Sequence, residues 1–259
     1  MRRIKLFLKG NLDLYDSIHS CRVNDTLCWN GLNETLKKLD SELRVQIKHE
    51  TFTRTDALLA SSGGIPKALL RHHLELGSFP IETQFSQEIF NANVDAYILS
   101  IQPDISVGLV RHKTEGYLLN AAHFSGWNIE QVDWFRKNFS QVPTLSPVES
   151  MDNFRLIIDR LRKKSAAPIL IFNVSSIIPG DNVHCHVGLV DSLSNRIQKF
   201  NLELINLSSE TGISIIDVNR VLACYGIDRV KLDSWHLNAT GLELVSKEVA
   251  KVLLEILNV

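Results

Sequence analysis

The sequence has few of the features that mark secreted, membrane or disulfide-rich proteins. Within its 259 residues, no apolar run approaches the roughly 18 to 20 residues that span a bilayer. The short run Ile4–Leu8 stops at Lys9 and has no small-residue cleavage site, so a buried strand is expected there rather than a secretory signal. Only four cysteines occur, at irregular spacing, which favours free thiols over a disulfide framework. The expected location is the cytoplasm.

The sequence also lacks the charge and glycine patterns that are typical of polyanion-binding and nucleotide-binding proteins. The formal net charge is −1 and no long block of like charge occurs, so a nucleic-acid partner is not expected. The segment Ser61-Ser62-Gly63-Gly64 has no lysine and does not directly follow a predicted strand, unlike phosphate-binding loops. We therefore expect no cofactor. The oligomeric state stays open.

Short apolar segments alternate with longer amphipathic ones along the chain. The short segments predict buried strands at Ile4–Leu8, Val45–Lys48, Ala96–Ser100, Pro168–Asn173 and Ile213–Asp217. The longer ones predict helices at Trp29–Leu39, Asp56–Leu74 with a break at Gly63-Gly64, Val148–Lys164, Leu189–Thr211 and Gly241–Leu257. This alternation predicts a single α/β domain, in which helices cover both faces of a mostly parallel five-stranded sheet.

The loops at the carboxyl ends of these strands are the expected place for a ligand. The longest segment without a predicted strand follows the third strand and covers about residues 101–146. Its aromatic residues include Tyr117, Phe124, Trp127, Trp134 and Phe135, and it is interpreted as a helical insertion. This insertion either roofs a pocket or packs on the domain as an extension.

Near the end of the chain an aspartate stands three residues before a histidine, in a loop that leads into the last predicted helix. Asp233 is close enough in sequence to accept the N–H of one ring nitrogen of His236. The other ring nitrogen is then available to a nucleophile, which is the acid–base half of a hydrolase triad. The alternative is a surface loop in which Asn238 caps the helix.

The C-terminal third, from the strand Pro168–Asn173 through Asp233-Ser234-Trp235-His236-Leu237 to Gly241, resembles the SGNH, or GDSL, hydrolase superfamily. The resemblance implies a flavodoxin-like three-layer α/β/α fold. It also implies hydrolysis or transfer of an acyl ester of a sugar, a lipid or a small metabolite. In such enzymes a serine after the first strand attacks the ester carbonyl, and an Asp-x-x-His pair activates it.

The N-terminal block departs from that pattern. Leu12 stands where the resemblance places the serine, and a leucine cannot attack an ester. A little later, Asp16-Ser17-Ile18 is similar to the Asp-Ser-Leu core of the superfamily. If residues 11–15 form an inserted bend, Ser17 is the nucleophile and His236 is its general base. The alternatives are a turn or helix cap made by Asp16 and Ser17, and Ser20 as a weaker candidate nucleophile.

The resemblance also implies a glycine and an asparagine that donate hydrogen bonds to the oxyanion, and both loops are altered here. An ionised Asp104, near the place of the asparagine, would repel an oxyanion. Replacement donors and neighbouring substrate-binding groups are therefore expected from a set of seven residues. These are Gly10, Asn11, Asp16, Arg54, Gln102, Asp104 and His184.

Val183-His184-Cys185-His186 contains residue types that bind zinc. Adjacent side chains of an extended segment point in alternating directions, and no second cluster with ligand spacing occurs, so no metal is expected. His184 or His186 is instead expected to line the pocket, and a thiol mechanism at Cys21 or Cys185 stays a minor alternative. The prediction is a serine-dependent esterase or acyltransferase that works through an acyl-enzyme. A catalytically silent binding or partner module is the alternative.

Overall fold

The computed structural model describes residues 2–19, 21–23, 26–29, 31–39, 42–74, 76, 79–121, 126–181 and 191–258. Contacts divide the chain into two compact units. The first comprises Met1–His49, Asn93–Gln102 and Ala166–Val259, and the second comprises Glu50–Ala92 and Pro103–Ser165. The single domain predicted from the sequence stays a prediction.

The first unit is built on the predicted sheet. Its strands are β1 (Arg2–Lys9), β4 (Leu43–Glu50), β5 (Ala96–Ser100), β9 (Ile169–Phe172) and β10 (Ser214–Ile216), and all five predicted strands are confirmed. The order across the sheet is β10-β9-β5-β1-β4, and the pairs β1–β5, β5–β9 and β9–β10 are parallel. This is a flavodoxin-like order, which reverses between β1 and β5 and directs ligands to the carboxyl ends there.

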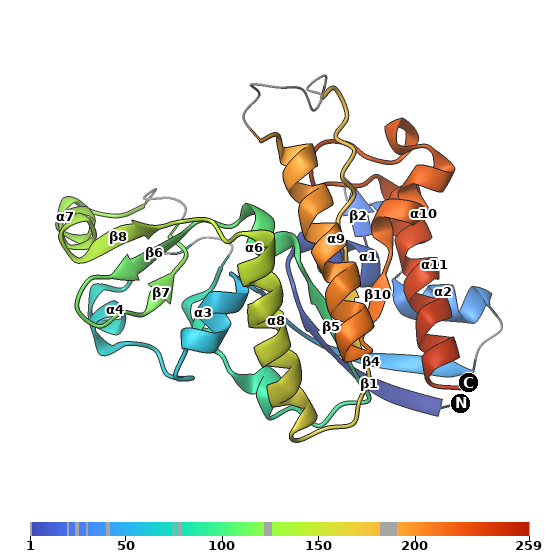
Figure 1. Ribbon diagram of the computed structural model, residues 1–259, viewed down its shortest axis with the longest axis horizontal. Coiled ribbons are helices and arrows are strands. Elements are labelled where there is room, and N and C mark those ends of the chain that lie inside the picture. The colour runs from blue at the N-terminus through green and yellow to red at the C-terminus, as the bar shows by residue number, and fades with distance from the viewer. Residues whose placement is uncertain are drawn as a thin grey trace. The chain divides into compact units, whose positions relative to one another are not determined.

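Amphipathic helices cover this sheet because each turns one apolar stripe inward. The helices of the first unit are α1 (Leu12–Ile18), α2 (Leu32–Lys38), α9 (Leu193–Thr211), α10 (Val218–Tyr225) and α11 (Ala239–Ile256). α11 contacts α1, α2 and α10, as Figure 1 shows for the last two. Apolar side chains from these four helices form one core cluster with those of the sheet.

Several boundaries differ from the predicted ones. The helix predicted from Trp29 begins at Leu32, because Trp29 ends β3 (Thr26–Trp29), which pairs antiparallel with β2 (Cys21–Val23). The helix predicted from Leu189 begins after its cap, Ser192, whose side chain accepts the N–H of Asn195. Helix α9 ends where predicted, at Thr211, and its C-cap is Gly212, which has a φ of +67°.

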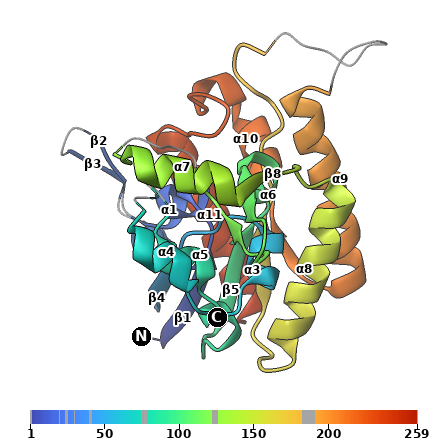
Figure 2. The same cartoon turned by 90° about the vertical axis from the view of Figure 1, so that its left-hand side faces the viewer.

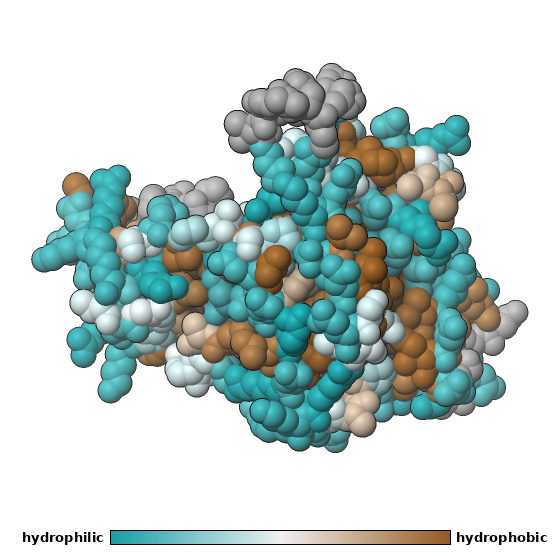
Figure 3. Space-filling model, viewed as in Figure 1, coloured by the Kyte–Doolittle hydropathy of each residue, from teal (hydrophilic) through white to brown (hydrophobic). Residues whose placement is uncertain are grey.

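The two ends of the chain lie close together in the first unit. Arg2 at the start of β1 donates from Nη1 to the carbonyl of Leu257, just after α11, at 3.4 Å. Both views place the termini close to each other (Figures 1 and 2). Figure 3 shows apolar side chains gathered over α9 and α11 on the face that it presents. No helix in the described part of the chain is both long enough and apolar enough to cross a membrane.

The second unit contains the segment predicted to be a helical insertion, and that prediction is wrong in part. Residues 101–146 include three short strands, β6 (Leu109–His112), β7 (Leu118–Leu119) and β8 (Phe139–Val142), which form an antiparallel sheet. Strands this short carry too little alternation to be recognised by period alone. The helices of this unit are α3 (Thr55–Ala60), α4 (Lys67–His72), α5 (Ile81–Phe85), α7 (Ile129–Asn138) and α8 (Pro147–Arg162), while α6 (Gln102–Ser106) begins at its boundary.

Candidate active site

The chain passes from β1 into α1 within three residues, and this short connection determines which side chains reach the site. Leu14 and Ile18, four residues apart, are buried in the core of the unit and hold one face of α1 against it. Asp13 in the first turn accepts the backbone N–H of Asn11 at 3.1 Å. Residues 11–15 therefore do not form the inserted bend on which the assignment of Ser17 depended, because α1 begins at Leu12.

Ser17 lies on the buried face of α1. Its side chain is fully buried, and its Oγ donates to the carbonyl of Asp13 at 2.6 Å, one helical turn earlier. A hydroxyl bonded to its own helix in the core cannot meet a substrate, so Ser17 as the nucleophile is wrong. The weaker candidate Ser20 lies outside the described residues. Leu12, at the position expected for the serine, is 55% exposed.

The predicted hydrogen bond between Asp233 and His236 is present. Asp233 Oδ2 lies 2.7 Å from His236 Nδ1, and Asp233 Oδ1 accepts the backbone N–H groups of Trp235 and His236 at 2.7 and 2.9 Å. These bonds, led by the one from Trp235, lower the pKa of Asp233 to about 2. The carboxylate therefore stays ionised and orients a half-exposed imidazole. The catalytic role of the pair stays a prediction.

Helix α11 holds this loop in place from the other side. Asn238 caps the helix by accepting the N–H of Gly241 at 3.0 Å, and its own N–H donates to the carbonyl of Val230 at 2.9 Å. A Cβ at Gly241 would lie 2.9 Å from that same carbonyl oxygen. The close approach of helix and loop therefore requires a glycine. The cap and the His–Asp pair, considered as alternatives in the sequence, coexist.

A pocket, here called the candidate pocket, lies at the carboxyl ends of the sheet strands in the first unit. Its apolar lining includes Leu12, Phe172, Val174, Val218, Leu222, Trp235, Leu237, Leu242 and Val245. Its polar lining consists of Asp13, Asp16, Gln102, Asn173, Ser175, Lys231, Ser234 and His236. The imidazole therefore stands beside a cavity with an apolar floor, as ligand sites of small molecules usually have.

Two carboxylates of α1 reach the candidate pocket. Asp13 Oδ2 accepts a hydrogen bond from Ser100 Oγ, at the end of β5, and burial raises the pKa of Asp13. Burial also raises the pKa of Asp16, while the charge of His236 lowers it and that of Asp13 raises it. Asp16 and His236 therefore act on each other electrostatically. Asp16 was expected among the substrate-binding residues, and that role stays a prediction.

Lys231 joins the loop of His236 to the loop after β9. Its Nζ donates to the carbonyls of Ser175 and Ile177 at 3.0 and 2.7 Å, and the side chain is almost fully buried. Burial lowers the pKa of Lys231 to about 8, although the charge of Asp233 partly raises it. Lys231 was not predicted as a site residue, although it stands directly at the start of the Asp233 loop.

Asparagines anchor the loop that follows β9. Asn201 of α9 accepts the N–H of Val174 at 3.2 Å and donates to its carbonyl at 2.7 Å. Asn219 of α10 accepts the N–H of Ser176 at 3.0 Å, and its own N–H donates to Asn173 Oδ1 at 3.0 Å. Sequence reasoning missed these anchors. The available signal was Asn201, a polar residue four positions after Ile197 on the apolar stripe of α9.

Only some of the other residues expected to bind the oxyanion are found at the candidate pocket. Gln102 lines the candidate pocket. The carbonyl of Gly10 lies 3.0 Å from His49 Nε2, and the N–H of Asn11 is bonded to Asp13. The N–H of Asn11 is therefore not available to an oxyanion in this arrangement. His184 lies outside the described residues.

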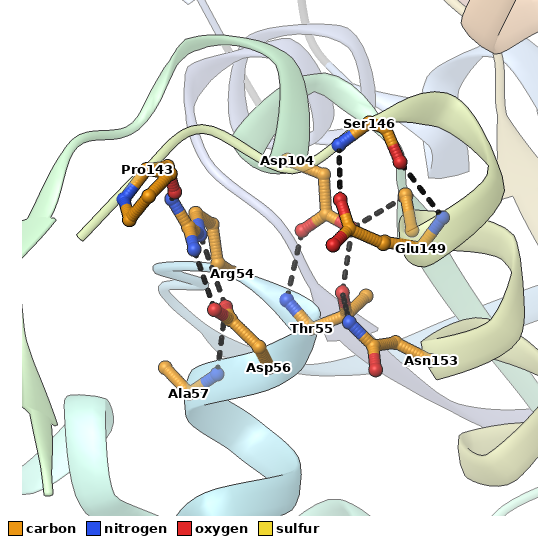
Figure 4. Close-up of polar contacts among 10 residues, drawn as sticks. Arg54, Thr55, Asp56, Ala57, Asp104, Pro143, Ser146, Glu149 and Asn153 are labelled. Carbon is orange, nitrogen blue, oxygen red and sulfur yellow. Dashed lines mark hydrogen bonds and ion pairs between the residues drawn. The ribbon is translucent and has the colours of Figure 1, made fainter. Parts of the chain in front are cut away.

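Arg54 and Asp104 belong to the interior of the second unit (Figure 4). The guanidinium of Arg54, 1% exposed, binds Asp56 through two hydrogen bonds and donates to the carbonyl of Pro143 at 3.0 Å. Asp104 accepts the N–H and the hydroxyl of Thr55 and the hydroxyl of Ser150, at 2.8, 2.6 and 2.6 Å. Both side chains are committed to these buried contacts, so their predicted roles toward the oxyanion or substrate are wrong.

The described residues contain no group of three or more histidine, cysteine, aspartate or glutamate side chains that could hold a metal ion. The residues 182–190, with the histidines and cysteine considered for zinc, lie outside the described ranges.

Comparison with known proteins identifies the fold. No protein-family model matches the sequence, and no curated protein matches it. Similar solved structures include an acetyl xylan esterase (TM-score 0.54, 12% identity, 96% of this chain and 100% of that one). They also include a member of the lipolytic G-D-S-L family from Veillonella parvula (0.51, 12%, 97% and 98%). An acetylxylan esterase from Geobacillus stearothermophilus is similar as well (0.50, 11%, 97% and 93%). The resemblance seen in the sequence is confirmed at the level of the fold: the chain has the three-layer fold of the SGNH hydrolases.

Proposed function

We propose that this protein acts on acyl esters and uses His236 to activate an external hydroxyl, from water or an alcohol, without an acyl-serine intermediate. The observation that carries the proposal is the 2.7 Å contact between His236 Nδ1 and Asp233 at a pocket where Leu12 takes the expected place of the serine. Solved structures of this fold that are described as acetyl xylan esterases support an ester substrate.

In the proposed reaction, Asp233 holds the Nδ1–H of the imidazole, so that Nε2 of His236 is the base. The external hydroxyl gives its proton to Nε2 while its oxygen forms a bond to the ester carbonyl carbon, and the carbonyl electron pair moves onto oxygen. When the tetrahedral intermediate collapses, the bond to the alcohol oxygen breaks. The departing oxygen takes the proton back from His236, which restores the neutral base.

The oxyanion of this intermediate needs hydrogen-bond donors, and two side chains of the candidate pocket are suited to the task. Lys231 uses two of its three ammonium hydrogens on the carbonyls of Ser175 and Ile177, which leaves a third for the pocket. Gln102 lines the same pocket and carries an amide N–H₂ group. A fixed donor of this kind is typically worth about 10² to 10³ in rate.

The proposal is tested by hydrolysis of p-nitrophenyl acetate and butyrate and of acetylated xylooligosaccharides. His236→Asn is expected to lower kcat/KM by about 10²- to 10⁴-fold, because it removes the base. Asp233→Asn lowers it as well, since a neutral amide does not stabilise the imidazolium. His73→Asn is the matched control, because it removes an exposed imidazole of the second unit at a φ of 47° that asparagine tolerates.

Serine chemistry is separated from this mechanism by a fluorophosphonate probe, which labels activated serines. The wild type is expected to turn over the ester without becoming labelled, and Ser17→Ala is expected to retain the activity. Labelling of the wild type, or loss of turnover in Ser17→Ala with an intact fold, would restore the acyl-enzyme mechanism and remove this one.

A second candidate, a catalytically silent binding or partner module, is favoured by one observation, the leucine at position 12. Such a module keeps the candidate pocket but has no turnover above the rate of buffer. Absence of hydrolysis with all three esters, together with binding of a ligand in the pocket, would select it.

A further inference from the structure

We propose that the candidate pocket takes a ligand that carries an ammonium group next to an apolar group, with Asp13 and Asp16 as the residues that recognise the cation. Only the placing of an ester bond in that ligand rests on the proposed function. The recognition of the cation stands on the pocket itself.

Charged side chains of both signs line the candidate pocket. Its charged lining consists of Asp13, Asp16 and Lys231, together with the titratable His236. Two of the three ammonium hydrogens of Lys231 are bonded to carbonyls, and Asp233 is the charged neighbour of this ammonium group. The two carboxylates of α1 therefore leave the lining with an excess of negative charge when His236 is neutral.

The surroundings of Asp13 do not supply a counter-charge. Its oxygens accept hydrogen bonds from Ser100 Oγ and the N–H of Asn11, both neutral donors, and it forms no ion pair with a described residue. Asp16 is three positions further along α1 and therefore lies on the same face. Burial and the charge of Asp13 disfavour the charged form of Asp16, whereas a charged His236 favours it, so a bound cation would stabilise both carboxylates when His236 is neutral.

An independent feature points to a polar ligand group at the same pocket. Ser175 is 3% exposed and lines the pocket, and its Oγ has no hydrogen-bond partner among the described residues. Such a buried hydroxyl costs free energy unless it is bonded, and it can accept a hydrogen bond from an ammonium group. Trp235 also lines the pocket, and an indole is an aromatic group of the kind that attracts cations.

The floor of the pocket determines the other half of the ligand. Phe172, Leu222 and Val245 line it and are almost fully buried, so an apolar group is expected there. An amine attached to a short hydrocarbon chain combines both requirements. In the ester reaction, the corresponding substrate class is an ester with a free amine on its acyl or alcohol part.

The test compares three probes of equal length, hexylammonium, 1-hexanol and hexanoate, by isothermal titration calorimetry at fixed low ionic strength. Hexylammonium is expected to bind the wild type about tenfold more tightly than 1-hexanol, and hexanoate more weakly than both. Asp16→Asn is expected to remove most of the preference for the cation. Asp228→Asn makes the same change of charge on the surface of the first unit, away from the lining, and is expected to leave the preference intact.

Asp13→Asn is a second variant, and thermal unfolding shows whether it folds. If it does not, Asp16→Asn still decides. Equal or tighter binding of hexanoate, or an undiminished preference in Asp16→Asn, would overturn the inference. The proposed function and the cation site can fail separately. Turnover of esters without a preference for hexylammonium would support the proposed function and overturn the cation site. A preference for hexylammonium without turnover would support the cation site and overturn the proposed function.

Discussion

Leu12 begins α1 at the candidate pocket, where the SGNH resemblance places a serine, and its side chain is 55% exposed. An exposed leucine contributes little to the core, so the position is free to vary without loss of the fold. The imidazole of His236 lines the same pocket, and its Nδ1 lies 2.7 Å from Asp233 Oδ2. Residue 12 is therefore the place where serine chemistry could be introduced by one change.

Leu12→Ser is expected to become labelled by a fluorophosphonate, because it sets a hydroxyl at the pocket that His236 serves as base. The adduct is located by mass spectrometry of the peptide that contains position 12. Leu12→Ala and the double variant Leu12→Ser/His236→Asn are the controls, and neither is expected to react. Equal labelling of the double variant would show that His236 does not activate this position.

Lys231 is a second residue whose removal has a defined cost. Lys231→Met leaves the carbonyls of Ser175 and Ile177 without their donor, and the free energy of unfolding is expected to fall by about 1 to 3 kcal/mol at pH 7. Urea unfolding measures the change. Lys199→Met, at an exposed ion pair with Asp191, is the control and is expected to change stability by less than about 1 kcal/mol.

The pH dependence of this difference also has a defined sign. In the folded protein the pKa of Lys231 is lowered to about 8, so between pH 8 and 10.5 the unfolded chain binds more protons there. The stability of the wild type relative to Lys231→Met is therefore expected to rise across that range. A relative stability that falls there would contradict the assigned burial of the ammonium group.

At the scale of elements, the packing of α11 against the loop of His236 controls the geometry of the site. The loop is closed by the pairing of Lys231 with Leu237 and by the hydrogen bond from Leu232 N–H to the carbonyl of His236 at 2.8 Å. Helix α11 fits against it only because Gly241 has no side chain.

Gly241→Ala is expected to lower the free energy of unfolding by about 1 to 3 kcal/mol, since its Cβ would meet the carbonyl oxygen of Val230 at 2.9 Å. The same shift should reduce ester turnover, because it displaces the loop that carries His236. Gly64→Ala, where nothing lies within 4 Å of the new Cβ, is the matched control. Wild-type stability in Gly241→Ala would show that the helix moves away at no cost.

At the scale of the whole molecule, each of the two units has its own buried network. In the second unit Asp104 of α6 connects Thr55 of α3 with Ser150 of α8, and burial raises the pKa of Asp104 to about 6. Since this pKa exceeds the ordinary aspartate pKa of 3.8, the folded state binds the proton more tightly than the unfolded state does. The resulting stabilisation of the folded state is complete below pH 3.8 and is lost as the pH rises through about 6.

We therefore expect the unfolding free energy of the wild type, relative to Asp104→Asn, to fall by up to about 3 kcal/mol between pH 4 and pH 7. Chemical unfolding of both proteins over this pH range measures the difference in their unfolding free energies. The titration of the other carboxylates contributes equally to both proteins and cancels in this difference. Asp152→Asn, at an exposed ion pair of α8, should show no such trend. A difference that does not vary with pH would mean that Asp104 titrates alike in both states.

Much of the site was predictable where neighbours in the chain determine the structure. The strand Ala96–Ser100 was predicted with its observed bounds, because five consecutive buried residues can be read without knowing their partners. The Asp233–His236 contact follows from a spacing of three residues in one loop. Arg54 and Asp104 were misplaced, because nothing local shows that they are buried in a network with Asp56, Thr55 and Ser150.

By itself, the sequence determined the parallel sheet, its covering helices and the orientation of the imidazole by its carboxylate, since each depends on residues within one segment. Only the tertiary structure decided which side chains meet at the pocket. Burial of Leu14 and Ile18 folds α1 as a helix of seven residues, too short to form alone. The register of this helix presents residues 12, 13 and 16 to the pocket and turns Ser17 into the core, because successive residues lie about 100° apart around the helix axis.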